Sequence, residues 1–164
     1  MTGLRTFLVL AIFGWLAVTA QVALAPRMTF WGFAPDLPVT LLGAAGLIVS
    51  RRASLVLGFA MGLGIGAAAG ASLSHYGVSR SIAAFCGPGL KSFGFRPSAS
   101  SAALNAVLLT FVAHLIFMFL APPKAIGAFL GDTIRAAVYD GVLAMPTYAA
   151  LRRLLPPTPS EEGF

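Results

Sequence analysis

The sequence predicts an all-α integral membrane protein, a compact bundle of six transmembrane helices with its N- and C-termini in the cytoplasm. The first observation is the composition, since 58% of the 164 residues are hydrophobic and 10% are charged, whereas soluble domains average about 25% charged residues. The second is a run of evenly spaced glycines within an apolar stretch, and the third is the position of the basic residues between apolar runs. The length suits one domain, expected over residues 1–155.

The first apolar run covers residues 7–25 and is long enough to cross a bilayer. A cleavable signal peptide is the competing interpretation, but the chain that follows is equally apolar. The second span is predicted over 35–50. Pro35 and Asp36 open it, because proline fits the first helical turn and the helix dipole favours an acidic side chain there. This span is short, which implies local thinning of the bilayer or burial among longer helices.

The third span, predicted over 53–73, carries a glycine at every fourth position, and at 3.6 residues per turn these glycines share one face. In water such a helix would be poor, since each glycine costs about 0.5 to 1 kcal/mol relative to alanine. In lipid, small residues let two helix backbones approach closely. We therefore expect this face to pack against a helix of the same chain or of a partner protein. It consists of Gly58, Gly62, Gly66 and Gly70.

The fourth span, predicted over 76–92, is interrupted by Arg80 and by the sequence Gly87-Pro88-Gly89. The positive-inside rule supports it. With six spans, seven basic residues are cytoplasmic and three lie outside, whereas without this span the count is four against six. Six spans place Arg80 near the outer surface. The cytoplasmic residues are then Arg5, Arg51, Arg52, Lys91, Arg96, Arg152 and Arg153, and the outer ones are Arg27, Arg80 and Lys124.

The last two spans are predicted over 101–121 and 125–150. Residues 156–164 are proline-rich and acidic, and we expect them to form a disordered cytoplasmic tail. The two spans contain four polar candidates for a role inside the membrane: Asn105, His114, Arg135 and Asp140.

Asp140 lies near the middle of the last span, where an aspartate costs about 2.5 to 3.5 kcal/mol on insertion scales. It is therefore expected to face protein and to have a partner on another helix. The candidates are His114 and Asn105, and Arg80 only if it reaches inward. Arg135 points elsewhere and could pair with Asp132, three residues before it.

No catalytic, cofactor-binding or metal site is predicted, and we expect a protein that is not an enzyme. Ser72, Ser74 and His75 are close in sequence but have no nearby acid to orient the histidine. His114 has no second metal ligand three or four residues away. The net charge of +6 does not indicate nucleic acid binding, because the basic residues are scattered rather than gathered in a stripe. The expected surroundings are membrane lipid.

Several short motifs, in their order and spacing, resemble the rod shape-determining protein MreD family. They are Pro35-Asp36-Leu37, Arg51-Arg52, Leu57-Gly58-Phe59 with Gly62-Leu63, and Ala144-Met145-Pro146 followed by Leu151-Arg152-Arg153. One position departs from the family, which commonly carries an aspartate in the third helix where this chain has Gly66. Either this chain does without that acid or Asp140 takes its role.

The resemblance implies a non-enzymatic, multi-pass component of the bacterial inner membrane and of the cell-elongation machinery. The family binds the bitopic protein MreC and helps link the peptidoglycan synthase complex to the cytoskeletal filament MreB. These partners are expectations from the resemblance alone.

An alternative of a different class is the substrate-binding S component of an energy-coupling-factor vitamin transporter, also a six-helix protein of this size. That family typically presents an Ala-x-x-x-Ala pattern in its first helix, and no two alanines in the first run here lie four residues apart. A third alternative, a small enzyme of lipid chemistry, would require clustered acids and histidines. The sequence favours the MreD resemblance over both.

Overall fold

The computed structural model describes residues 2–29, 32–70 and 72–155, and this part of the chain is all-helical, with 81% helix and no strand. Six helices of ten or more residues run alternately along the bundle, and two short helices, η1 (Ala25–Arg27) and α5 (Gly89–Ser92), lie in the connections. The six are α1 (Thr2–Ala23), α2 (Leu37–Gly46), α3 (Arg51–Ala68), α4 (Leu73–Cys86), α6 (Ala99–Leu120) and α7 (Ile126–Leu154).

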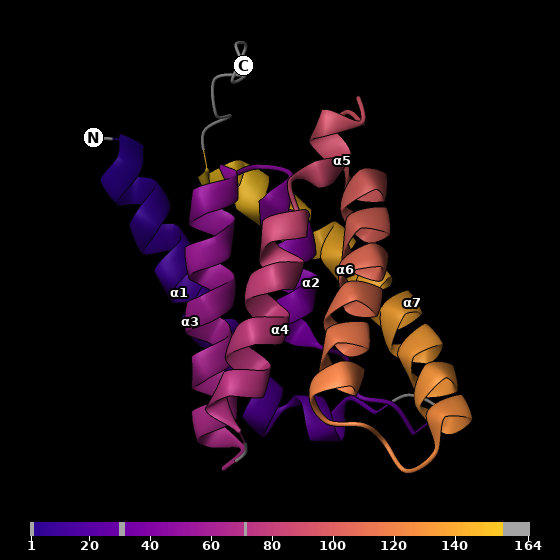
Figure 1. Cartoon of the computed structure of the whole chain (residues 1–164). Coiled ribbons are helices and arrows are strands. Elements are labelled where there is room, and N and C mark those ends of the chain that lie inside the picture. Colours follow the sequence, from indigo (N-terminus) through magenta and orange to yellow (C-terminus); the bar gives the residue numbers. More distant parts are fainter. Residues whose placement is uncertain (1, 30–31, 71, 156–164) are drawn as a thin grey trace.

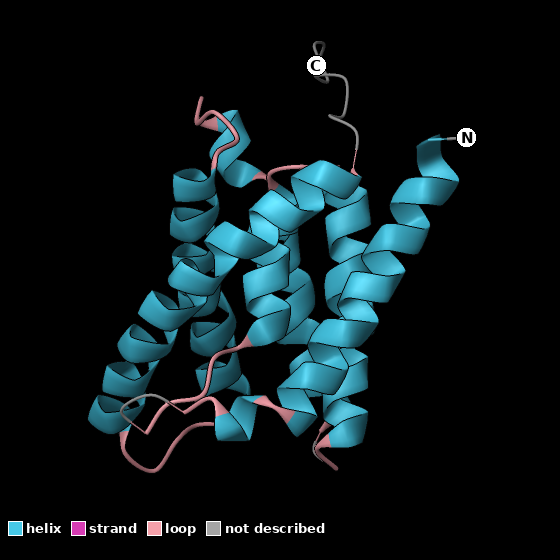
Figure 2. Ribbon diagram, turned by 180° about the vertical axis from the view of Figure 1, so that it is seen from behind, coloured by secondary structure: helices cyan, strands magenta, loops and turns pink. Residues whose placement is uncertain are grey.

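The first residues of α1 and the last residues of α7 lie at the same end of the bundle, which we call the termini end (Figure 1). The opposite end, called the far end, holds η1 and the connection between α6 and α7, and the segment before α2 rises from it into the bundle. Seen from behind, α7 crosses the bundle obliquely, and α1 leans away from it toward the termini end (Figure 2). The bundle is therefore wider at the termini end beside α1.

Helix α2 lies at the centre of the bundle, and nine of its ten residues are buried. A helix of ten residues is about 15 Å long, roughly half of a typical hydrocarbon core. The expected span over 35–50 is therefore wrong in length, and of its two expected explanations the structure shows burial among longer helices. Glycine permits this burial, because a Cβ on Gly43 would lie 2.6 Å from the Cα of Ala106 in α6.

The predicted glycine face packs against α4 over three of its four positions. A Cβ on Gly58 would lie 2.4 Å from the Cβ of Ala84, and one on Gly62 would lie 2.5 Å from the carbonyl oxygen of Tyr76. Gly66 similarly faces the backbone of Leu73. Gly70 does not belong to this face, because α3 ends at Ala68 and Gly70 adopts a left-handed φ of 59° in the turn that follows.

The remaining boundaries differ modestly from the expected spans 7–25, 76–92, 101–121 and 125–150. α4 stops at Cys86 and α5 follows Pro88, so the Gly-Pro-Gly sequence breaks the helix. α7 continues past the expected end to Leu154. The predicted tail, 156–164, lies outside the described residues. Arg80, which was expected near the outer membrane surface, is buried within the bundle, with 5% of the residue exposed.

Within the described residues, two helices are long and apolar enough to cross a membrane, Gly3–Ala23 and Ala99–Leu120. By itself this is weak evidence for membrane crossing, because signal sequences and buried core helices share these properties. The distribution of side chains adds to the evidence for a membrane location. Large apolar side chains of α1, α3, α4, α6 and α7 face outward, whereas Asp36, Thr40, Arg80, Asn105, Thr110 and Asp140 are buried.

Candidate functional site

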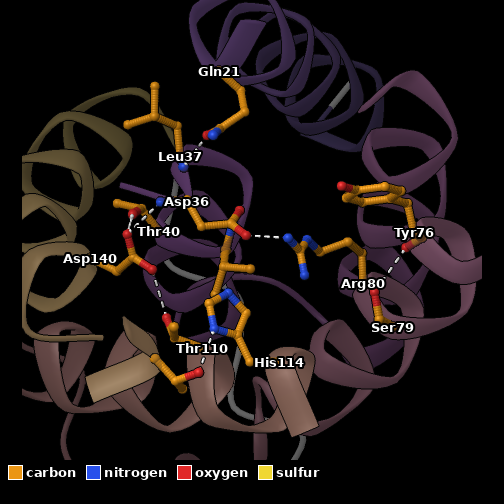
Figure 3. Close-up of polar contacts among 12 residues, drawn as sticks. Gln21, Asp36, Leu37, Thr40, Tyr76, Ser79, Arg80, Thr110, His114 and Asp140 are labelled. Carbon is orange, nitrogen blue, oxygen red and sulfur yellow. Dashed lines mark hydrogen bonds and ion pairs between the residues drawn. The ribbon is translucent and has the colours of Figure 1, made fainter. Parts of the chain in front are cut away.

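The candidate site is a cluster of buried polar side chains in the interior of the bundle, where α2 begins, and it is shown in Figure 3. It begins at Asp36, which caps the N-terminus of α2 by accepting a hydrogen bond from the Val39 backbone N–H at 3.2 Å. The other carboxylate oxygen of Asp36 forms an ion pair with Nη2 of Arg80 in α4. A capping carboxylate thus joins the start of α2 to the middle of α4.

Asp140 of α7 lies beside this ion pair and is fully buried. Its Oδ1 accepts hydrogen bonds from the Asp36 backbone N–H at 2.7 Å and from the Thr40 hydroxyl at 3.3 Å. Its Oδ2 accepts one from the Thr110 hydroxyl at 2.7 Å. The partners of Asp140 are therefore donors on α2 and α6, and the expectation of His114, Asn105 or Arg80 is wrong.

Asn105 and His114 make other contacts. The Asn105 side-chain amide donates to the Gly43 carbonyl oxygen at 2.8 Å, which ties α6 to α2. His114 Nδ1 lies 3.0 Å from the Thr133 hydroxyl, and that hydroxyl donates to the Phe129 carbonyl oxygen. The contact between His114 and Thr133 ties α6 to α7.

Arg135 and Pro146 lie away from the buried cluster. Arg135 is exposed, and its guanidinium carbon lies 4.5 Å from the centroid of the Phe33 ring, so the expected pair with Asp132 is not formed. Pro146 is an exposed residue inside α7, where its ring leaves the Val142 carbonyl without a helical N–H partner. Neither residue contributes to the polar cluster.

A pocket of about 310 Å³ lies beside the cluster and draws its lining from α1, the segment before α2, α3, α4, α6 and α7. Gln21 borders it, and the Gln21 side-chain oxygen accepts the Leu37 backbone N–H at 2.7 Å. The rings of Tyr76 and Phe117 lie 5.1 Å apart, and the Arg80 guanidinium lies 5.9 Å from the Tyr76 ring. The pocket thus combines aromatic rings with buried polar groups.

The glycine face determines how closely α4, and with it Arg80, approaches the interior. A Cβ on Gly58 would lie 2.6 Å from the carbonyl oxygen of Arg80, so the two backbones are in contact at this point. One turn away, the Ser54 hydroxyl donates to the Ala84 carbonyl oxygen at 2.9 Å. A larger residue at position 58 would push α4 outward and take Arg80 away from Asp36.

A second hollow, an apolar groove of about 990 Å³, lies between α1 and α3. Its lining is dominated by apolar and small side chains, including Ala11, Gly14, Ala60 and Gly64. The two helices are in contact at Gly14, where a Cβ would lie 2.9 Å from Leu57, and at Gly64, where a Cβ would lie 3.2 Å from Val18, and the start of α1 leans away from the bundle (Figure 2). The groove is therefore a wedge that widens toward the termini end.

Sequence reasoning singled out Asp36 and Asp140 but missed the side chains that surround them. Thr40, Thr110 and Gln21 lie in largely apolar runs and Tyr76 in a polar stretch, and nothing in their spacing distinguishes them. Arg80 offered a signal, because a charge in the middle of an apolar run is expected to face protein. Among the described residues no group of three His, Cys, Asp or Glu side chains is placed to hold a metal ion.

These features define an all-helical bundle with a buried polar centre and two hollows, one polar and one apolar. Comparison of the chain with family models, with curated proteins and with solved structures found no match.

Proposed function

We propose that the protein is a multi-pass component of the bacterial inner membrane and acts as a non-enzymatic scaffold of the cell-elongation machinery. The partners come from the MreD resemblance: MreC as the direct partner, the peptidoglycan synthase complex, and MreB indirectly. The observation that carries the scaffold role is the apolar groove between α1 and α3.

The membrane location is supported by the surface of the bundle. Soluble monomers rarely expose large contiguous apolar patches, yet the outward faces of five helices here carry leucine, isoleucine, valine and phenylalanine. The distribution of basic residues supports a topology that follows the positive-inside rule. The seven basic residues assigned to the cytoplasm belong to elements at the termini end, whereas Arg27 and Lys124 lie at the far end and Arg80 lies in the middle of α4.

The groove suits a transmembrane helix of a bitopic partner. Its walls are two helices that diverge, and small residues on both walls would allow a third helix to approach their backbones. Ala11 and Ala60 are exposed in the groove, so an added helix would cover them. On the family resemblance, the helix that binds in the groove is the single transmembrane helix of MreC.

The test is co-purification in mild detergent of the wild-type chain and of the variant Ala11→Leu/Ala60→Leu, which fills the groove. We expect the variant to recover MreC at least about tenfold less well, because adding side-chain volume to a packed helix contact costs about 1 to 3 kcal/mol. Ala149→Leu, on the exposed face of α7, is the matched control and should leave recovery unchanged.

Equal recovery of MreC by the groove variant would contradict the assigned docking site. Failure of the wild type to recover MreC would contradict the scaffold role itself. Recovery of an ATPase pair with a bound vitamin would instead identify the chain as an S component.

Topology is tested separately by single cysteines at Thr2 and Ser160 in a Cys86→Ala background, since Cys86 is exposed. Both should resist a membrane-impermeant thiol reagent added to intact spheroplasts, whereas Lys124→Cys should be labelled. Labelling at Thr2 or Ser160 would contradict the arrangement with six spans and both termini in the cytoplasm.

A further inference from the structure

The pocket at the far end contains buried donors that the chain itself does not satisfy. Arg80 lines the pocket, and its Nη2 is occupied by Asp36. Its Nε and Nη1 are buried and have no hydrogen-bond partner among the described residues. Unsatisfied buried donors on a charged group are rare and unfavourable. An oxygen acceptor in the pocket would remove this penalty.

The charges around Arg80 favour an uncharged acceptor. Asp36 already neutralises the guanidinium, and both oxygens of Asp140 accept hydrogen bonds from α2 and α6. An anion would therefore bring an unpaired charge into a buried site that is already balanced. A carbonyl oxygen accepts the same hydrogen bonds without adding charge.

The shape of the pocket favours a flat molecule. Its volume of about 310 Å³ lies at the small end of the range known for ligand sites, about 300 to 1,000 Å³. Aromatic side chains form part of the wall, with Tyr76 and Phe117 tilted against each other at 5.1 Å. The side chains of Tyr76, Arg80 and His114 lie around the same space (Figure 3). Rings beside a donor suit a planar ligand that carries a carbonyl group.

We propose that this pocket binds a small, uncharged, planar molecule that presents a carbonyl oxygen to the Arg80 guanidinium and its ring to Tyr76 and Phe117. The ligand is a free molecule that enters from the far end, which is the outer side in the proposed topology. The site goes beyond the scaffold role and depends on none of its protein partners.

Three probes of one ring size separate the features of this proposal. Nicotinamide carries the neutral carbonyl, nicotinate carries a carboxylate, and pyridine lacks the carbonyl group but keeps the ring nitrogen that nicotinamide also has. We expect saturation-transfer NMR on the purified full chain in detergent to detect nicotinamide, with a dissociation constant on the order of 1 mM for so small a probe. Nicotinate and pyridine should bind at least about tenfold more weakly, since nicotinate adds a buried charge and pyridine offers no carbonyl oxygen to Arg80.

A pocket-filling variant controls for non-specific binding. Ala136 lines the pocket from α7, so Ala136→Leu should reduce nicotinamide binding about tenfold while the Arg80–Asp36 pair remains. Val138→Leu, on the exposed face of the same helix, should have no effect. Circular dichroism melting verifies that both variants are folded.

Absence of nicotinamide binding to the folded wild type would overturn the proposal, and so would binding that Ala136→Leu does not weaken. Stronger binding of nicotinate would overturn the choice of an uncharged ligand. A signal that disappears when the chain is placed in phospholipid nanodiscs would show that lipid fills the pocket, which would overturn the assignment to a free molecule. Loss of MreC recovery leaves this site unaffected, so the two proposals fail separately.

Discussion

The contact between α3 and α4 is built on glycines of α3, whereas the surroundings of Asp140 are rich in polar side chains. In the first region, glycine brings the backbone of α3 against the carbonyl oxygens of Arg80 and Tyr76. In the second, one carboxylate accepts three hydrogen bonds from two neighbouring helices. The glycine contact is sensitive to added volume and the polar centre to removed partners, so opposite kinds of substitution separate them.

The largest effect is expected at the polar centre. Arg80→Met should lower the free energy of unfolding by about 3 to 5 kcal/mol, because it leaves the buried Asp36 carboxylate without its counter-charge. Unfolding in detergent, followed by circular dichroism, measures this loss. Arg135→Met is the matched control, since Arg135 is exposed and loses only its contact with Phe33, worth about 0.5 to 1 kcal/mol.

The double variant Asp36→Asn/Arg80→Met tests the cause of that loss. It removes both charges, so it should be more stable than Arg80→Met alone. A double variant as unstable as the sum of the two single variants would mean that Arg80 acts through packing rather than through charge.

A smaller effect is expected at the glycine contact. Gly62→Leu should cost about 1 to 3 kcal/mol by overpacking, because even the first added carbon would lie 2.5 Å from the Tyr76 carbonyl oxygen. The same unfolding measurement applies. Gly131→Ala in α7 is the control, since an added carbon there meets no atom within 4 Å and alanine favours the helix by roughly 0.5 to 1 kcal/mol. Equal stability of Gly62→Leu and wild type would show that the α3–α4 contact can accommodate a larger side chain.

The smallest effect is expected from a single hydrogen bond of the polar centre. Thr110→Val keeps the side-chain shape but removes the donor to Asp140, and should cost about 1 kcal/mol, the net contribution of a typical hydrogen bond. Stability measured for this variant and for Thr133→Val, whose hydroxyl contacts His114 instead, distinguishes the centre from its surroundings. A larger loss at Thr133 than at Thr110 would contradict the central place of Asp140.

Sequence patterns predicted the helical class, the approximate positions of the apolar runs and the importance of Asp36 and Asp140. Periodicity reveals such features because it depends on neighbours along one helix. The length of α2 was not predictable, because the residues that follow the helix are as apolar as the helix itself, and the sequence pattern does not change where the helix ends. The ion pair of Arg80 was not predictable for a related reason. Its partner Asp36 is 44 positions away, and only the folded bundle brings them together.

The short buried helix α2 has a consequence for biosynthesis in the proposed membrane setting. A ten-residue helix cannot cross a hydrocarbon core by itself, and much of its cover comes from α6 and α7, which are made later on the ribosome. Residues 35–50 must therefore enter the membrane together with α3 as a hairpin, or stay at the translocon until α6 and α7 have been synthesised. Nascent chains that stop before α6 would still hold α2 without the helices that cover it.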